Sequence, residues 1–185
     1  DLGPLEPVMP ERLHTRDGRL HLAPKELVAD LERLRARVAV WANEPAGALV
    51  LTGRRELRSN NSWCHNSLRL VKGPVRCTLR MHPDDAAARG IVAGDRVRVA
   101  SRAGEVTAPV ELSDEVMRGV VSLPHGYGHD RPGVRLSVAA AHAGVSVNDV
   151  TDAQVIDALC GTASLTGVAV EVTRAEAMTV ADAAE

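Results

Sequence analysis

Residues 96–112 read R-V-R-V-A-S-R-A-G-E-V-T-A-P-V-E-L, and this stretch decides the fold class. Val97 and Val99 alternate with arginines, and from Val106 to Leu112 every second residue is apolar. Side chains of a β-strand point alternately to its two faces, so a period of two places the apolar ones on one side. The stretch therefore predicts strands of a sheet that has one buried face.

Short apolar runs on both sides of this stretch have the same character. Together with residues 96–101 and 105–112, strands are predicted at residues 48–52, 68–71, 76–81, 119–123 and 167–172. Short helices are predicted between them at residues 83–89, 113–118 and 152–159, from the capping residues at their starts and glycines after their ends. Many short strands with short helices between them indicate a mainly β protein, a closed or nearly closed barrel rather than a βαβ sheet.

The first 46 residues have a different pattern. Residues 1–23 alternate prolines and charges, as a connector does, and the chain begins at Asp1. From Pro24 onward, apolar residues at three- and four-residue spacing predict one amphipathic helix over residues 24–42; they are Leu27, Leu31, Leu34, Val38 and Trp41. We expect a piece of a longer protein, with residues 1–46 as a linker and helix from the preceding domain, 47–174 as the barrel and 175–185 as a tail.

Composition narrows the functional classes. Aromatic residues make up 2% of the chain and the net charge is −2, so neither a base-stacking platform nor a general polyanion surface is expected, and we predict no nucleic-acid partner. The three cysteines show no C-x-x-C spacing, which speaks against structural zinc and a disulfide framework and favours a reducing, cytoplasmic setting. No apolar run approaches the roughly 18 residues of a membrane-spanning helix, so no membrane segment is predicted.

The stretch from residue 48 to residue 67 places many polar side chains directly after a strand. Thr52, Gly53 and Arg54 end that strand; the glycine permits close approach of a ligand, and the arginine offers a planar fork of donors. A mixture of donors and acceptors follows, supplied by Asn60, Asn61, Ser62, His65 and Asn66. This mixture suits a polar ring, but on composition alone a solvated turn is favoured, because Asn-Asn-Ser is common in turns.

Two later segments are also candidates for ligand contact. In L-P-H-G-Y-G-H at residues 123–129, the histidines are spaced as metal ligands are on a helix, but Gly126 and Gly128 argue against a helix. A loop in which His125 faces a ligand is favoured over a metal site, and a plain turn remains possible. Asn148 and Asp149 precede a predicted helix, where capping and ligand contact are equally supported.

No catalytic residue or metal ligand is predicted. Cys64 and His65 are neighbours in an extended segment, where their side chains point to opposite sides. There is no G-x-S-x-G motif and no carboxylate pair framed for acid–base chemistry; Asp84 and Asp85 suit the first turn of a helix instead.

Taken in this order, the loops resemble the C-terminal domain of the molybdopterin oxidoreductases, the dimethyl sulfoxide reductase family that includes formate dehydrogenases and nitrate reductases. The resemblance covers roughly residues 47–174. It rests on L-T-G-R at 51–54 with R-S-N-N-S-W-C-H-N at 58–66, H-P-D-D-A at 82–86 with G-I-V-A-G-D-R-V-R-V at 90–99, L-P-H-G at 123–126, and V-N-D at 147–149. Tyr127 departs from the family's more usual tryptophan.

The resemblance implies a double-psi β-barrel of the aspartate decarboxylase-like class, preceded by one amphipathic helix. It also implies a bis-molybdopterin guanine dinucleotide cofactor with molybdenum or tungsten. By position, Thr52, Gly53 and Arg54 would approach the pterin or the pyrophosphate. The pterins would be contacted by Asn60, Asn61, Ser62, His65, Asn66, His125, Gly126, Asn148 and Asp149.

In that family the metal ligand and any iron–sulfur cysteines belong to N-terminal domains. The resemblance therefore implies a cofactor-binding domain of a larger oxidoreductase, with the N-terminal domains of the same enzyme as its partners and no activity alone. An iron–sulfur cluster is expected only in the full-length enzyme. Two alternatives remain open: a barrel that binds protein or substrate, as in the N-terminal domains of some AAA ATPases, and a stand-alone small subunit of a molybdenum or tungsten enzyme.

Overall fold

The computed structural model describes residues 3–9, 11–44 and 47–175. Contacts divide the chain into two units, residues 1–44 and residues 45–185. Among the described residues, no helix combines the length and apolar character needed to cross a membrane.

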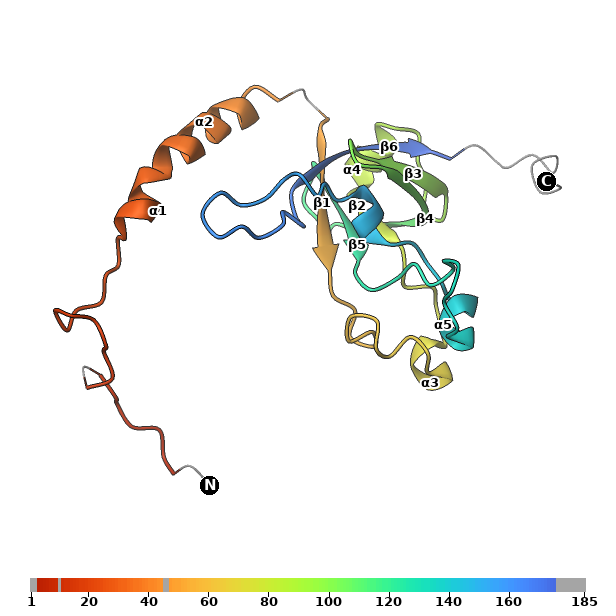
Figure 1. Cartoon of the computed structure of the whole chain (residues 1–185). Coiled ribbons are helices and arrows are strands. Elements are labelled where there is room, and N and C mark those ends of the chain that lie inside the picture. The colour runs from red at the N-terminus through yellow and green to blue at the C-terminus, as the bar shows by residue number, and fades with distance from the viewer. Residues whose placement is uncertain (1–2, 10, 45–46, 176–185) are drawn as a thin grey trace, which may run out of the picture. The chain divides into compact units, whose positions relative to one another are not determined.

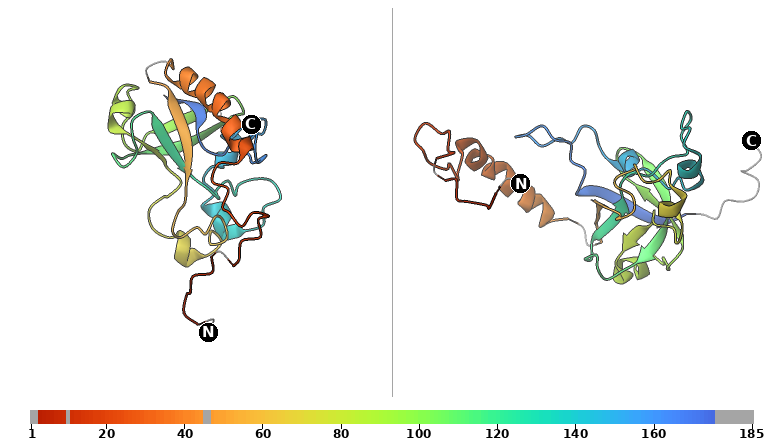
Figure 2. Two further views of the ribbon diagram at one scale, coloured as in Figure 1. Left: turned by 90° about the vertical axis from the view of Figure 1, so that its left-hand side faces the viewer. Right: turned by 90° about the horizontal axis from the view of Figure 1, so that it is seen from below.

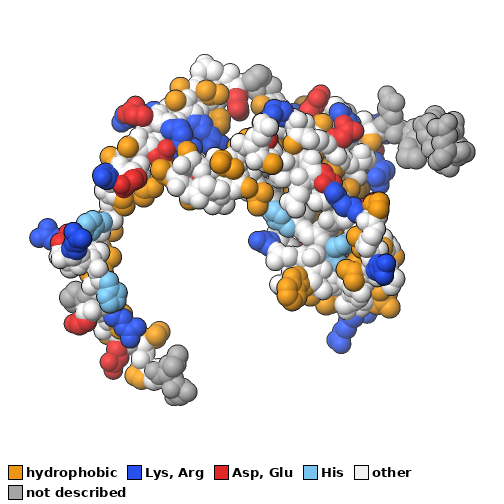
Figure 3. All heavy atoms as spheres, viewed as in Figure 1, with side chains coloured by type: hydrophobic (Ala, Val, Ile, Leu, Met, Phe, Trp, Pro, Cys, Tyr) orange, Lys and Arg blue, Asp and Glu red, His pale blue; other side chains and the backbone are white. Residues whose placement is uncertain are grey.

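The N-terminal unit contains helices α1 (Lys25–Ala29) and α2 (Leu31–Trp41) (Figure 1). The single predicted helix is divided at Asp30, yet the break is slight, because Asp30 keeps helical angles (φ −72°, ψ −11°). Its amide donates to the Glu26 carbonyl and its carbonyl accepts from the Leu34 amide. No residue of α1 or α2 is buried, and the predicted apolar face is about half exposed, from 46% at Leu31 to 54% at Leu27. Figure 3 shows hydrophobic side chains on the surface of the molecule.

In the described part of the C-terminal unit, six strands form a closed barrel in the order β1-β5-β2-β4-β3-β6 (Figures 1 and 2). They are β1 (Leu49–Arg54), β2 (Leu79–Met81), β3 (Arg96–Ala100), β4 (Glu105–Leu112), β5 (Val120–Pro124) and β6 (Val168–Arg174). This is a double-psi β-barrel, as predicted. The described helices of this unit are short: α3 (Leu68–Val71), α4 (Pro83–Ala87), α5 (Ser137–Ala141) and the 3-10 helix η1 (Val147–Val150).

The barrel has an internal two-fold pattern. Exchanging β1, β2 and β3 with β4, β5 and β6 leaves the strand order unchanged. The exchange also places the parallel pair β1/β5 on the parallel pair β4/β2. Because β2 runs antiparallel to β5, the carboxyl ends of the two parallel pairs lie at opposite ends of the barrel. The two ends can therefore be compared directly.

Alternating side chains of the strands fill the barrel. Val97 and Val99 are fully buried, and Val106, Ala108 and Val110 face the same core, so the alternation that predicts the fold is confirmed. The rest of the core is aliphatic, with Leu79, Met81 and Val121 fully buried. Burial of these side chains is the main term that stabilises the barrel.

Three predicted elements are wrong. Residues 68–71 form α3 rather than a strand: the Ser67 carbonyl accepts from the amides of Leu70 and Val71, and Leu68 is 70% exposed. Residues 113–118 are turns in the connection from β4 to β5, where the Ser113 hydroxyl accepts from the Glu115 amide. Among the described residues, neither segment pairs with a strand of the barrel.

Residues 152–159 also form turns rather than a helix. The carboxylates of Asp152 and Asp157 accept hydrogen bonds from nearby backbone amides, which offers the backbone an alternative to helical bonding. The segment then folds back, with a bridge between Ile156 and Ala163. By contrast, the helix predicted after His82 forms as α4, with Asp84 and Asp85 in its first turn.

Candidate functional site

The carboxyl ends of β1 and β5 bring two candidate segments together. The strands are parallel, and Arg54 lies opposite Pro124, so the loops that follow them leave from the same end of the barrel. The His125 amide donates to the Arg54 carbonyl at 3.0 Å. A Cβ on Gly53 would lie 2.1 Å from Nε2 of His125. Any side chain at position 53 would therefore collide with the imidazole of His125, which explains why a glycine is found there.

The two loops also touch through their backbones. Gly126 has φ +91°, and a Cβ there would lie 2.0 Å from the carbonyl oxygen of Asn61. Asn60 and Asn61 themselves have positive φ values of 42° and 62°, a conformation that asparagine adopts more readily than most residues. This turn leaves the side chains of Asn60, Asn61 and Ser62 exposed, without hydrogen bonds to other described residues.

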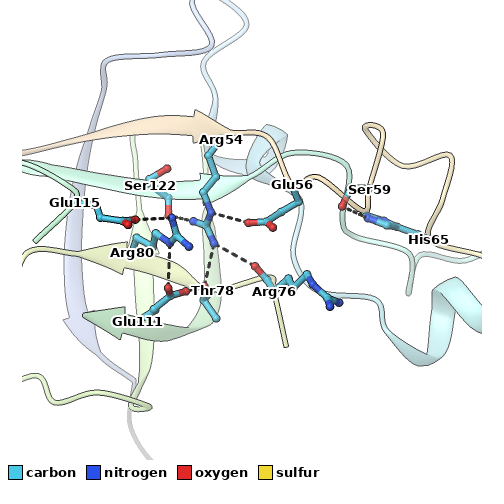
Figure 4. A network of polar contacts seen from close by, with 10 residues as sticks. All are labelled: Arg54, Glu56, Ser59, His65, Arg76, Thr78, Arg80, Glu111, Glu115 and Ser122. Carbon is cyan, nitrogen blue, oxygen red and sulfur yellow. Dashed lines mark hydrogen bonds and ion pairs between the residues drawn. The ribbon is translucent and has the colours of Figure 1, made fainter. Parts of the chain in front are cut away.

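Arg54 is engaged within the protein (Figure 4). Its guanidinium donates to Glu56 at 3.1 Å, to the Ser122 carbonyl at 2.6 Å, to the Arg76 carbonyl at 3.1 Å and to the Thr78 hydroxyl at 3.0 Å. An arginine has five N–H donors, so most of them are used in these bonds. With its side chain 13% exposed, Arg54 joins the end of β1 to β5 and to the segment that leads into β2.

A second group of polar contacts lies beside Arg54 (Figure 4). Glu111 accepts from the Thr78 hydroxyl at 2.7 Å and from Arg80 at 3.1 Å. Burial alone would raise the pKa of Glu111, but the hydrogen bond from Thr78 and the charges of Arg80 and Arg54 lower it below the usual range. Glu111 therefore stays ionised at neutral pH and completes a network that crosses from β1 to β4.

His65 lies inside the loops rather than on their surface, with an exposed fraction of 3%. Its Nδ1 is 2.8 Å from Nε2 of His129, and its Nε2 is 2.8 Å from the Ser59 hydroxyl. The Tyr127 ring packs against it at 4.3 Å between centroids. Burial and the neighbouring His129 lower the pKa of His65, so it is neutral at pH 7. His65 thus fastens the loop after β1 to the loop after β5.

Asn66 has a similar internal role. Its Oδ1 accepts from the amides of Val138 and Ala139, which lie in the first turn of α5. The side chain therefore satisfies amides that a helix leaves without internal partners. Asn66 links the loop after β1 to α5.

Asn148 and Asp149 lie in η1, which packs beside the loop after β5. The Asp149 carboxylate forms an ion pair with Arg131, and the Asn148 carbonyl accepts from the Thr151 hydroxyl. A Cβ on Gly128 would lie 2.8 Å from Cβ of Ser146, so the two segments are in close contact. The structure therefore brings all three candidate segments into one connected layer, although the helix that was to follow Asp149 does not form.

A cavity of about 550 Å³ lies beside this layer. Of the candidate residues, only His65 lines it, and Asp149 lines a second cavity of about 410 Å³. Ser59, Tyr127 and His129 were not predicted, and their contribution arises from contacts between distant segments. Among the described residues, no group of three or more His, Cys, Asp or Glu side chains is arranged to hold a metal ion.

Comparison with known proteins identifies the family that the motifs indicate. A family model described as "Molydopterin dinucleotide binding domain" matches residues 49–169. The dimethyl sulfoxide/trimethylamine N-oxide reductase of Rhodobacter capsulatus is 47% identical over 60 residues, which cover 32% of this chain and 7% of that protein. The arsenate respiratory reductase molybdopterin-containing subunit of Chrysiogenes arsenatis is 33% identical over 127 residues, covering 63% of this chain and 15% of that protein.

The fold has a solved counterpart. The structure of acetylene hydratase from Pelobacter acetylenicus superposes with a TM-score of 0.59 at 18% identity, over 85% of this chain and 21% of that one. The chain therefore spans only a small part of the length of these relatives. The family match covers most of the barrel, from β1 into β6. The chain belongs to the molydopterin dinucleotide binding domain family.

Proposed function

We propose that this chain holds a bis-molybdopterin guanine dinucleotide cofactor as one domain of a larger molybdenum or tungsten oxidoreductase. The observation that carries the proposal is the surface formed where the loops after β1 and β5 meet. There the backbone contact between Gly126 and Asn61 leaves Asn60, Asn61 and Ser62 exposed, and their side chains have no hydrogen-bond partner among the described residues. Such side chains suit a ligand whose ring carries both donors and acceptors.

The donor set fits a pterin. Asparagine amides and a serine hydroxyl can each donate and accept, and His125 adds a partly exposed imidazole. Burial, and then the charge of Arg55, lower the pKa of His125, so at pH 7 it is neutral and offers one donor and one acceptor. When bound, the cofactor would supply two-electron redox chemistry at its metal; this chain would bind and orient it.

The roles of the candidate residues differ under this proposal. Asn60, Asn61, Ser62 and His125 would contact the pterin, with Thr52 and Gly53 beside them. His65, Asn66 and Asp149 would act by holding the loops, since their polar atoms bond within the protein. Arg54 has little donor capacity left for the pyrophosphate. Gly126 shapes the loop, and Asn148 lies exposed at its edge.

The rest of the pocket would come from elsewhere in the enzyme. The metal ligand and any iron–sulfur cluster would belong to N-terminal domains of the same protein, which would be the partners of this barrel in the cytoplasm. On this basis residues 1–185 alone would be inactive and would bind the intact cofactor weakly or not at all. Tight stoichiometric binding of the cofactor by the isolated chain would contradict the proposal that the N-terminal domains supply part of the pocket.

The test uses the full-length enzyme, with molybdenum, tungsten and pterin measured after purification. The double variant Asn60→Gly/Asn61→Gly removes both amides, while glycine keeps the left-handed backbone at low cost. We expect it to lose most of the pterin and metal but to keep the thermal stability of the wild type. Asn43→Ala, at an exposed asparagine just after α2, is the control and should keep full occupancy. A wild-type enzyme without molybdenum or tungsten would refute the proposal.

A further inference from the structure

The larger cavity has an unusual charge distribution. It lies between the segment 58–77, strands β3 and β4, and the segment 141–145, and we call it the arginine cavity, after Arg58, Arg76 and Arg96 in its lining. Asp130 is the acidic residue of the lining, which also contains His65 and His142. The lining therefore carries an excess of positive charge.

The three arginines differ from most others in the barrel. Arg80, Arg98, Arg102 and Arg131, among others, form ion pairs with carboxylates. Within the described part of the chain, Arg76 donates only to the carbonyls of Val71 and Lys72, and Arg96 only to the carbonyl of Thr107. Arg58 has no hydrogen bond or ion pair with any described residue. Cations that gather around one cavity without carboxylate partners favour an anionic ligand.

The remaining lining indicates what else the ligand carries. Leu70, Val71, Pro109 and Val145 give the arginine cavity apolar walls, and the Tyr127 ring is among its lining residues. At about 550 Å³, the space is within the range of sites for small molecules and cofactors. A guanidinium fork matches the oxygens of a phosphate group and binds it through two parallel hydrogen bonds. The lining thus suits a phosphate ester that bears an apolar or aromatic body.

We propose that the arginine cavity binds a diphosphate-bearing ligand, with Arg58 as the principal phosphate contact and Arg76 and Arg96 in support. The proposal rests on the proposed function to the extent that the dinucleotide end of the pterin cofactor is one source of this diphosphate; a free nucleoside diphosphate is the other. It assigns the phosphate contact to three arginines that were not among the predicted site residues, in place of Arg54, whose donors are used within the protein.

The first experiment titrates residues 1–185 with GDP, ADP and inorganic pyrophosphate, followed by the backbone amide signals of Cys77, Tyr127 and Val145. We expect saturable shifts with a dissociation constant on the order of 1 mM for GDP, because only part of a complete pocket is present. Binding should weaken as salt is raised, since it depends on charge. The absence of a saturable shift with all three probes overturns the proposal.

The second experiment compares arginine variants. Arg58→Gln should raise the dissociation constant about tenfold, as expected for a lost charge-assisted hydrogen bond, and Arg58→Lys should recover part of the loss. Arg69→Gln is the matched control: Arg69 is an exposed arginine of α3 that does not line the cavity, and the change removes the same charge. Equal effects of Arg58→Gln and Arg69→Gln would show unspecific attraction and refute the site.

These readouts separate this inference from the proposed function. If the full-length enzyme contains the cofactor but Arg58→Gln changes no titration, the site is wrong and the function stands. If GDP binds through Arg58 but the full-length enzyme contains no pterin, the cavity takes a free nucleotide and the proposed function fails. A preference for GDP over ADP supports the cofactor as the source, whereas equal binding of GDP, ADP and pyrophosphate supports a site that reads the diphosphate alone.

Discussion

At the carboxyl end of the β1/β5 pair, the chain leaves in two loops that contact each other and expose polar side chains. At the corresponding end of the β4/β2 pair, Met81 is followed almost at once by α4, and Leu112 by the short connection 113–119. That end is closed within the protein: the Ser113 amide donates to the Met81 carbonyl, and the Asp85 carboxylate accepts from the Gly119 amide at 2.7 Å. The same strand topology therefore gives one open end and one sealed end.

The difference between the two ends lies in the loops that carry the candidate site rather than in the strands. Both ends use parallel strands, so the strand geometry itself does not create the candidate surface. What distinguishes the open end is the pair Gly53 and Gly126, where a Cβ would lie 2.1 Å from His125 and 2.0 Å from Asn61. At the sealed end, a Cβ on Gly119 would lie 3.5 Å from the Ala48 carbonyl, an ordinary contact. At the end that carries the candidate site, a glycine thus admits close approach of a side chain at Gly53 and of the backbone at Gly126.

The largest effect is expected for Gly126→Ala. Its φ of +91° is unfavourable for alanine, and the Cβ would displace the Asn61 backbone, so the free energy of unfolding should fall by about 3–4 kcal/mol. Gly119→Ala is the control, because Gly119 also has positive φ (+78°) but has room for a Cβ; it should cost about 1–2 kcal/mol. Urea unfolding of both variants measures the difference. Equal losses would remove the distinction between the two ends.

The next largest effect concerns the arginines of Figure 4. Arg54→Met should reduce the free energy of unfolding by about 2–3 kcal/mol, because Glu56, at 19% exposure, and the carbonyl of Ser122 lose a charged donor. Arg80→Met should cost less than about 1 kcal/mol, because its partners Glu111 and Glu115 are 41% and 74% exposed and water can replace the arginine. If Arg54→Met were the milder change, Arg54 would instead be free for a ligand.

The smallest effect is a pH dependence at the open end. The pKa of His65 in the folded chain is lowered by burial and by His129, whereas the unfolded chain takes up this proton near pH 6.5. Between pH 6.5 and the lower folded value, the unfolded state binds more protons, so stability falls as pH falls, by at most about 1.4 kcal/mol per pH unit for this group. His65→Gln should flatten the dependence measured from pH 7 to pH 5. An unchanged slope would mean that the His65 contacts with Ser59 and His129 do not govern it.

Much of the fold could be predicted from the sequence, because a period of two in apolar residues reports directly on a half-buried strand. Val97, Val99, Val106 and Val110 are core residues for that reason. The prediction of a strand at residues 68–71 is wrong because a short run such as L-R-L-V suits a strand or a helical turn equally well. Only a neighbouring strand could decide between them, and such a neighbour is not visible in local sequence.

The candidate site was predictable as a set of segments rather than as a set of contacts. The motifs indicate which loops matter, and the structure brings those loops together. The sequence could not show that His65 is buried while Asn60 is exposed, because both lie in one polar run. Nor could it show that Arg54 bonds internally while Arg58 does not, since this depends on the positions of Ser122, Arg76 and Thr78.

The final strand has a consequence for how the chain folds. β6 pairs with β1 through Leu49–Leu51 and with β3 through Val97–Ala100, so it joins the first strand of the barrel to the third. Pairings between residues so distant in sequence form slowly, because a long loop must be closed before they contribute. We therefore expect the barrel to stay open during synthesis until residue 174 has left the ribosome, and the two loops at its open end to be ordered only after that closure.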